Sequence, residues 1–331
     1  MNRKLSEAIT DDPHAGFGRP PRHTRPRTKA RPSYADAEAA MVVRVDRGRF
    51  GCLVATTGIT VTATKARSLG RSAVIVGDEV NLVGDTSGNE GTLARIVEVG
   101  ARRTLLMRTA DDDDPYERPI VANADQLVIV TALADPAPRP GMIDRILVAA
   151  YDGGLEPLLI FTKADLASVH ELTQIYEPLG LRMLTSEPGA DHSELLRLLT
   201  GQVSVLVGHS GVGKSTLVNA LIPGVDRATA EVNEVTGKGR HTSTSAIALR
   251  LPSGDGWVID TPGVRSFGLS HVTVESIVAA FGDLDELAVD CPRGCTHETG
   301  TLDCAFDSAV ADGKLAAGRL ESFRRIEKAW M

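Results

Sequence analysis

The chain has 331 residues, of which 42% are hydrophobic and 24% are charged, with a formal net charge of −7. This composition is ordinary for a globular protein of two or three domains. No run of eighteen apolar residues occurs and the first residues lack the apolar segment of a secretory signal, so we expect a cytoplasmic protein without a membrane span.

The N-terminal segment differs in charge from the rest of the chain. Residues 1–36 hold eight Lys or Arg against four Asp or Glu, about +4, which leaves about −11 for the remainder. Five prolines and few large apolar residues in this segment predict a disordered basic arm over residues 1–37, because so little apolar surface cannot offset the ordering entropy. Contact with nucleic acid and a merely solvated tail both remain open for it.

Short β runs separated by turn signals follow over residues 38–101. They are MVVRVDRGRFGCLVAT, ITVTATKA, SAVIVGDEVNLV and GTLARIVEVG, with a hairpin expected at Arg47-Gly48. Five short strands in about sixty residues predict an OB-type β-barrel. Such barrels often bind oligonucleotides, and the basic residues of this one favour RNA: Arg44, Arg49, Lys65, Arg67 and Arg71.

From residue 102 to 270 buried strands alternate with helices. The strands are QLVIVTAL, EPLLIFTKAD, SVLVG and GWVIDTPG, and the helices are MIDRILVAAYDGG and KSTLVNALI. This alternation predicts a doubly wound α/β domain with a parallel sheet. The remaining segment, 271–331, contains a cysteine cluster and a charged helix, GRLESFRRIEKAW.

A complete GxxxxGK[ST] phosphate-binding loop lies between an apolar strand and an amphipathic helix. Its residues are Gly208, His209, Ser210, Gly211, Val212, Gly213, Lys214 and Ser215, and Thr216, which follows, is expected to contact the nucleotide as well. Glycines allow backbone N–H groups to surround phosphate oxygens at a helix N-terminus. We expect Lys214 to reach the β- and γ-phosphates and Ser215 to ligate Mg²⁺. A glycine-rich connector is the alternative.

The base-recognition motif [NT]KxD matches Thr162, Lys163, Ala164 and Asp165. The Asp165 carboxylate can accept the N1–H and N2–H₂ hydrogens of guanine, a donor pair that adenine lacks. The alternative interpretation is that these four residues form an exposed turn at the end of a strand. A second base-contacting loop is expected at Thr185-Ser186.

Asp260-Thr261-Pro262-Gly263 follows a strand and matches DxxG. Asp260 is expected to hold Mg²⁺ through water and the Gly263 N–H to sense the γ-phosphate; a simple β-turn is the alternative. Residues 237–245 read GKGRHTSTS, a switch loop in which Thr242, or its rival Thr244, ligates Mg²⁺.

The order of these motifs predicts a circular permutation. Ordinary GTPases place the phosphate loop first and the base motif after DxxG, whereas here the base motif stands at 162, the phosphate loop at 208 and DxxG at 260. Rejoining a compact α/β domain at surface loops preserves its packing, so this order is physically allowed.

The spacing Cys291-x₃-Cys295-x-His297-x₆-Cys304 predicts one structural zinc ion. Three thiolates and one imidazole complete a tetrahedral shell with no open position. A catalytic cysteine paired with His297 and unrelated surface thiols are the alternatives.

A β-barrel, a permuted GTPase domain and a Cys₃His zinc domain in this order resemble the RsgA family of bacterial GTPases. The resemblance covers about residues 38–331 and rests on GDEV, TKAD, GHSGVGKST, GRHTST, DTPG and the cysteine run. It implies a monomeric GTPase that binds the small ribosomal subunit and its rRNA, acts late in its maturation, and hydrolyses GTP to GDP faster when bound there. Three residues, rather than four, separate the first two cysteines, and the basic arm is not a general feature of the family.

The residue after DxxG is Val264, whose apolar side chain cannot orient the attacking water as a Gln does in many GTPases. His241 resembles the histidine of the family's switch loop and is the candidate for that role. A solvated loop histidine is the alternative. Two other function classes stay open: an rRNA-binding module that GTP tunes with incidental turnover, and a P-loop kinase or ATPase, against which Asp165 argues.

Overall fold

The computed structural model describes residues 34, 36–70, 73–108, 118–224, 246–261, 269 and 272–329. The chain divides into two units, Met1–Ala35 and Asp36–Met331, and nearly all described residues belong to the second. The predicted arm, residues 1–37, lies outside the described residues except at positions 34, 36 and 37, and its last two residues belong to the second unit.

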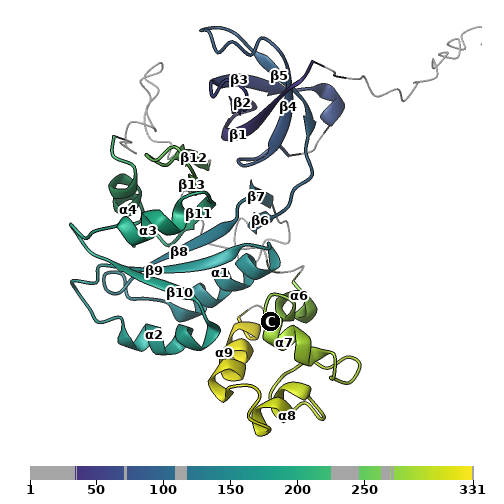
Figure 1. Ribbon diagram of the computed structural model, residues 1–331, viewed down its shortest axis with the longest axis vertical. Helices are drawn as coiled ribbons and strands as arrows, with labels where there is room; N and C mark the ends of the chain where they lie inside the picture. Colours follow the sequence, from purple (N-terminus) through teal and green to yellow (C-terminus); the bar gives the residue numbers. More distant parts are fainter. Residues whose placement is uncertain are drawn as a thin grey trace, which may run out of the picture. The chain divides into compact units, whose positions relative to one another are not determined.

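Five strands close the predicted barrel (Figure 1). They are β1 (Glu38–Asp46), β2 (Arg49–Val54), β3 (Thr60–Lys65), β4 (Glu79–Gly84) and β5 (Ala94–Val99), with a 3₁₀ turn, η1, at Arg67–Leu69. The pairing order is β1-β2-β3-β5-β4, and β4 pairs back with β1. Arg47 and Gly48 have φ of 40° and 85° at the β1–β2 turn, which is the predicted hairpin.

The GDEV motif joins the barrel to the next segment. The Asp78 carboxylate is fully buried, accepts from the Ile75 N–H at 2.9 Å and binds the Arg102 guanidinium at 2.7 Å. The Asn123 amide donates to the Gly77 carbonyl at 3.0 Å. A two-stranded sheet follows, β6 (Leu105–Arg108) with β7 (Arg118–Ala122).

A mixed sheet forms the α/β part in the order β10-β9-β8-β11-β13-β12. The strands β8 (Gln126–Ala132), β9 (Glu156–Thr162), β10 (Arg182–Ser186), β11 (Val203–Val207) and β13 (Trp257–Asp260) are parallel, and β12 (Ile247–Arg250) is antiparallel. Its helices are α1 (Pro140–Asp152), α2 (His170–Tyr176), α3 (Ser193–Leu199) and α4 (Lys214–Leu221), with a 3₁₀ turn, η2, at Glu177–Leu179.

Both faces of this sheet are covered, as the prediction of a doubly wound domain requires. Along β8, Leu127 and Ile129 pack into a core with α1 and α2, whereas Val128 and Val130 pack into a second core with α3 and α4. Successive strand residues point to opposite faces, so a strand buried on both sides is apolar throughout.

Four helices complete the described C-terminal part: α6 (Val274–Val278), α7 (Gly282–Ala288), α8 (Ala305–Ala311) and α9 (Ala317–Glu327). Their buried side chains belong to the same core as α1 and α2, and the Arg325 guanidinium binds the buried Asp144 carboxylate of α1 at 3.1 Å. This segment therefore shares its core with the α/β part. The predicted domain boundaries after residues 37, 101 and 270 stay predictions.

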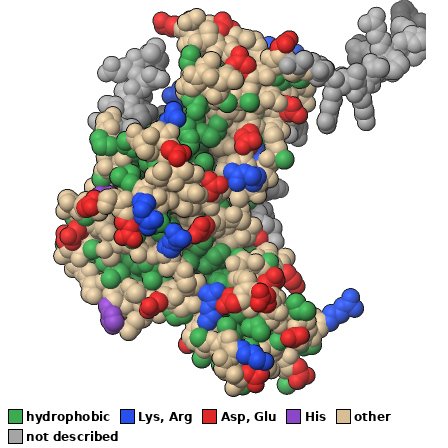
Figure 2. Space-filling model, viewed as in Figure 1, with side chains coloured by type: hydrophobic (Ala, Val, Ile, Leu, Met, Phe, Trp, Pro, Cys, Tyr) green, Lys and Arg blue, Asp and Glu red, His purple; other side chains and the backbone are tan. Residues whose placement is uncertain are grey.

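On the face seen in Figure 2, acidic and basic side chains are interspersed rather than gathered by sign. That face does not favour one class of partner by its charge. No helix among the described residues is long and apolar enough to cross a membrane.

Candidate functional site

The phosphate-binding loop connects the end of β11 to the start of α4. Gly211 and Gly213 have φ of 84° and 88°, a region that L side chains rarely adopt. A Cβ on Gly208 would lie 2.4 Å from the Val130 carbonyl oxygen. These three glycines are therefore required by backbone conformation and close approach.

Lys214 and Asp260 meet inside the site although they lie far apart in the sequence. Strands β11 and β13 are parallel neighbours, with Leu206 opposite Asp260. The Lys214 ammonium lies 3.0 Å from Asp260 Oδ1 and donates to the Thr261 carbonyl. Both side chains are buried, and Ser215 and Thr216 of the first turn of α4 are exposed. The structure thus brings the phosphate loop and the start of DTPG together.

Thr162 links the base motif to the phosphate loop. Its hydroxyl lies within hydrogen-bond distance of the Val212 carbonyl and of the Thr131 carbonyl, the latter at 3.2 Å. The following Lys163 has φ of 56°, and its ammonium donates to the Asp135 carbonyl. A threonine hydroxyl can therefore connect the two loops at a position where the related motif more often has asparagine.

The two predicted base loops lie against each other at the ends of β9 and β10. Ser186 pairs with Thr162 in the parallel register, and the Ala164 N–H donates to the Ser186 carbonyl at 3.3 Å. Asp165 and Thr185 are exposed and free to meet a ligand from solvent. The Ser186 hydroxyl lies 3.0 Å from His192 Nε2, a contact that the sequence does not predict.

Several predicted site residues lie outside the described part of the chain. They are His241, Thr242, its rival Thr244, Gly263 and Val264.

An open pocket adjoins the phosphate loop. It is lined by Met142, Ile143 and Ile146 of α1, by Gly208 and Val212 of the loop, and by the polar side chains of Thr131, Arg139 and His209. The pocket therefore offers both apolar and hydrogen-bonding groups beside the loop.

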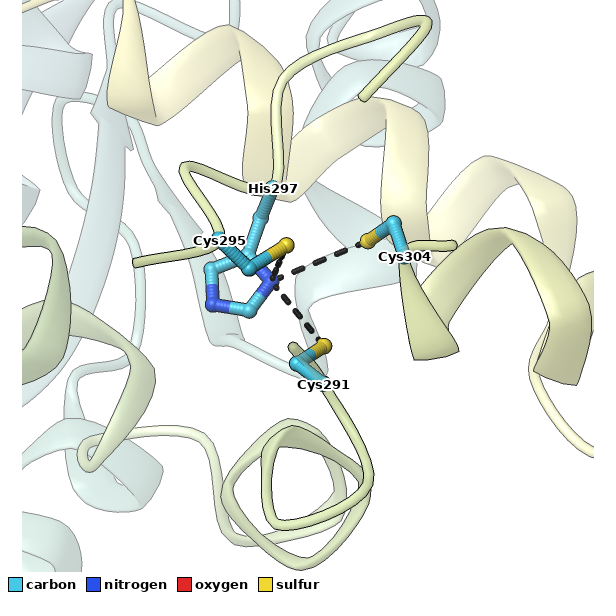
Figure 3. Close-up of side chains that lie close together, drawn as sticks. All are labelled: Cys291, Cys295, His297 and Cys304. Atoms are coloured by element: carbon cyan, nitrogen blue, oxygen red, sulfur yellow. Dashed lines mark hydrogen bonds between the residues drawn. The ribbon is translucent and has the colours of Figure 1, made fainter. Parts of the chain in front are cut away.

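The four predicted metal ligands converge in the C-terminal part (Figure 3). Their ligand atoms all lie within 4.8 Å of one another. His297 Nδ1 is 3.6 Å from the sulfur of Cys291, 3.5 Å from that of Cys295 and 3.7 Å from that of Cys304. Zn–S bonds of about 2.3 Å and Zn–N bonds of about 2.0–2.1 Å at tetrahedral angles place N and S about 3.5 Å apart. The donor set and its spacing therefore fit a tetrahedral metal ion.

The electrostatics at Cys291 and Cys304 argue against either residue as a nucleophile. Burial raises the pKa of Cys291 to about 11 and also raises the pKa of Cys304, while burial lowers the pKa of His297. A reactive cysteine needs a lowered pKa. A divalent cation would instead stabilise the thiolates and bind the neutral imidazole.

Neighbouring groups hold the His297 loop in place. His297 has φ of 57°, and its ring stacks on Phe306 at 4.2 Å between centroids. Arg324 of α9 donates to the His297 carbonyl at 2.8 Å and binds Asp307 through two hydrogen bonds of 2.7 and 2.9 Å. Arg324 is a residue of the metal centre that spacing alone does not reveal, because it lies 27 positions from His297.

Comparisons with known proteins identify the family of the chain. A family model described as RsgA GTPase matches residues 99–270. The small ribosomal subunit biogenesis GTPase RsgA of Ectopseudomonas mendocina (strain ymp) is 40% identical over 263 residues, 77% of this chain and 74% of the relative. The protein of that name from Chlorobaculum tepidum is 37% identical over 276 residues, 80% of this chain and 88% of the relative.

Two solved structures share the fold. The crystal structure of YjeQ from Thermotoga maritima matches with a TM-score of 0.66 and 26% identity, over 88% of this chain and 98% of that one. YloQ, described as a circularly permuted GTPase, matches with a TM-score of 0.63 and 22% identity, over 88% and 94%. The fold predicted from the sequence, a permuted GTPase domain with a barrel and a Cys₃His cluster, is confirmed.

Proposed function

Because the chain belongs to the RsgA GTPase family and is thus a GTP-hydrolysing enzyme, we propose that it binds the small (30S) ribosomal subunit and assists its late maturation. Relatives at 40% identity are named small ribosomal subunit biogenesis GTPases. From the structure, the supporting observation is the meeting of the phosphate loop, the base loops and Asp260 at one edge of a parallel sheet. We further propose that the enzyme is a cytoplasmic monomer that contacts rRNA.

Turnover measurements test this proposal directly. GTP hydrolysis by the full chain is measured with purified small subunits, with large subunits and with neither. We expect acceleration by small subunits alone. Small-subunit binding that responds to GTP but leaves turnover unchanged would instead indicate an rRNA-binding module with incidental hydrolysis.

The triphosphate is assigned to residues 208–216, with Lys214 on the β- and γ-phosphates. Mg²⁺ bound with GTP would neutralise charge on these phosphates, held by the hydroxyls of Ser215 and Thr242 and, through water, by Asp260. The Gly263 N–H would sense the γ-phosphate, and His241 would orient the attacking water. Support for this assignment comes from the position of the buried Lys214 ammonium between Asp260 and the Thr261 carbonyl.

Guanine is assigned to Asp165, with Lys163 along the base plane. The exposure of the Asp165 carboxylate beside the Ser186 loop supports this assignment. Asp165→Asn replaces one acceptor by a donor, so we expect the variant to prefer xanthosine triphosphate, whose base presents the complementary acceptor. Competition between GTP, ATP and xanthosine triphosphate measures the change, and an unaltered preference for GTP would remove Asp165 from the base site.

We also propose that the Cys₃His cluster holds one structural zinc ion. The nitrogen–sulfur spacing of 3.5–3.7 Å supports zinc, and four protein ligands leave no coordination position for a substrate. Metal analysis of protein purified without chelators should find one zinc per chain.

A further inference from the structure

The loop that follows β10 is closed by a side-chain contact between Ser186 and His192. We propose that His192 is a positioning residue for guanine recognition, acting through Ser186. The inference rests on the proposed base site, and it extends that site to a residue outside both base motifs.

Ser186 occupies a central position between the base loops. It is the last residue of β10, lies opposite Thr162 in the sheet and is only 8% exposed. Its carbonyl oxygen accepts from the Ala164 N–H at 3.3 Å. Any displacement of Ser186 therefore moves the loop that carries Asp165.

The exposed residues beyond Ser186 can supply a contact that Asp165 cannot. With the N1 and N2 edge of guanine on the carboxylate, the neighbouring O6 oxygen requires a hydrogen-bond donor. The adjoining loop, residues 187–191, is largely exposed. Pro188 has no N–H and the Ala190 N–H donates to the Glu187 carbonyl at 3.1 Å, so the backbone donors left for a ligand are those of Glu187, Gly189 and Asp191. A loop held in its binding conformation loses less entropy on binding than a free one.

His192 fixes this loop at its base. Its Nε2 lies 3.0 Å from the Ser186 hydroxyl, which ties the two ends of the loop together. The neighbouring Asp191 carboxylate accepts from the Ser193 N–H at 2.9 Å and from its hydroxyl at 2.8 Å. His192 stands at the N-cap of α3 but makes no side-chain capping hydrogen bond, so capping does not account for its contact with Ser186.

Affinity for fluorescent GDP in the presence of Mg²⁺ tests the role of His192. Loss of one neutral hydrogen bond predicts about three- to tenfold weaker binding for His192→Ala. Inosine diphosphate keeps O6 but lacks the 2-amino group. His192→Ala should lower the affinity for this nucleotide by the same factor, relative to wild type. His192→Gln, whose amide reaches the position of Nε2, should restore affinity to within about twofold of wild type.

A double-mutant cycle separates positioning from general destabilisation. Ser186→Ala removes the same contact from the other side, and the variant with both changes should bind no more weakly than either alone. His170→Ala is the matched control, because His170 begins α2 and its N–H, rather than its ring, bonds Ser168. We expect the control to bind GDP as wild type does.

The failures of the two proposals are distinguishable. Wild-type protein that binds ATP as well as GTP would refute the base site itself. Guanine-selective wild type with unchanged affinity in His192→Ala, or with additive losses in the double variant, would refute only the role of His192. If His192→Ala does not fold, Ser186→Ala and His192→Gln carry the same comparison.

Discussion

The proposed nucleotide site and the proposed metal centre differ in the kind of atom that would bind the ligand. In the phosphate loop the binding groups are backbone N–H groups, oriented by Gly211 and Gly213 at positive φ and fixed between β11 and α4. In the metal centre the binding groups are four side chains from short loops and a helix start. The phosphate loop is positioned by a sheet that is buried on both faces. The Cys₃His cluster lies among helices of only five to eleven residues.

This difference indicates where each ligand contributes to stability. The phosphate loop lies between β11 and α4, so we expect nucleotide to bind a backbone frame that the sheet already fixes. Short helices are marginal alone, and a structural zinc ion can contribute apparent free energies of about 10–16 kcal/mol. We therefore expect removal of the metal to unfold or loosen the C-terminal helices. We expect changes in the phosphate loop to lower the rate of GTP hydrolysis.

The largest expected effect is the loss of zinc from Cys304→Ser. The substitution removes one of four ligands, so we expect purified protein without stoichiometric zinc and with loosened helices α7 to α9, observed by metal analysis and hydrogen exchange. GDP affinity should stay close to wild type. Cys52→Ala is the matched control, because Cys52 is the cysteine outside the cluster and is buried in the barrel. Full zinc content in Cys304→Ser would remove this residue from the ligand set.

Lys214→Ala tests the contribution of the phosphate loop to turnover. Removing a preorganised charge from the phosphates should lower single-turnover GTP hydrolysis by about 10²–10³-fold. Zinc content should remain at one per chain. Lys314→Ala provides the control, since Lys314 is exposed and pairs with Asp312 at 3.2 Å. A loss of zinc in Lys214→Ala would show that the two regions depend on each other.

The elements that sequence predicts well are those whose chemistry lies in consecutive residues. Glycine spacing predicts the phosphate loop because positive φ is a local demand, met at Gly211 and Gly213. Cysteine and histidine spacing predicts the metal ligands because their identity alone limits the chemistry. The five barrel strands follow in the same way from alternation and turn signals.

The remaining features depend on tertiary contacts between distant residues. The Thr162 hydroxyl reaches the Val212 carbonyl fifty positions away. Threonine at this position, where the base motif more often has asparagine, therefore connects the two loops. The buried side chains of the C-terminal segment pack with α1 and α2, which the spacing of its cysteines does not reveal. Arg324 and His192 act through partners that no local pattern marks.

Arg324→Lys tests whether Arg324 supports the affinity of the Cys₃His cluster for zinc. Lysine keeps the charge but cannot make the forked contact with Asp307 while donating to the His297 carbonyl. Outer-shell changes weaken metal binding by about 10–100-fold, so zinc release to a chelator should show a correspondingly weaker affinity. Arg319→Lys is the matched control on the same helix, where Arg319 binds Asp283 at 2.8 and 3.0 Å. Equal zinc affinity in the two variants would assign Arg324 to packing alone.

The smallest expected effect is a pH dependence of stability that originates at Glu327 of α9. Glu327 is 1% exposed, and its Oε1 has no hydrogen-bond partner within the described part of the chain. Burial, together with the nearby Glu298 charge, raises the pKa of Glu327 to about 7, against lowering by Arg324 and Lys328. Between its usual value and about pH 7 the folded protein therefore binds more protons than the unfolded chain.

The Glu327 carboxyl therefore lowers the free energy of unfolding as the pH rises from the usual pKa of a glutamate to about 7. Above about pH 7 it causes no further loss. Glu327→Gln mimics the protonated form and should match wild type near pH 4.5, then exceed it by about 1–3 kcal/mol at pH 8. Denaturant unfolding of zinc-loaded protein across this range measures the difference, and the shared metal ligands cancel between the two proteins. A constant difference at all pH values would place the effect in packing rather than in ionisation. A difference that grows with pH would locate an acid-stabilised group in α9, where the C-terminal helices pack against the core of the α/β part.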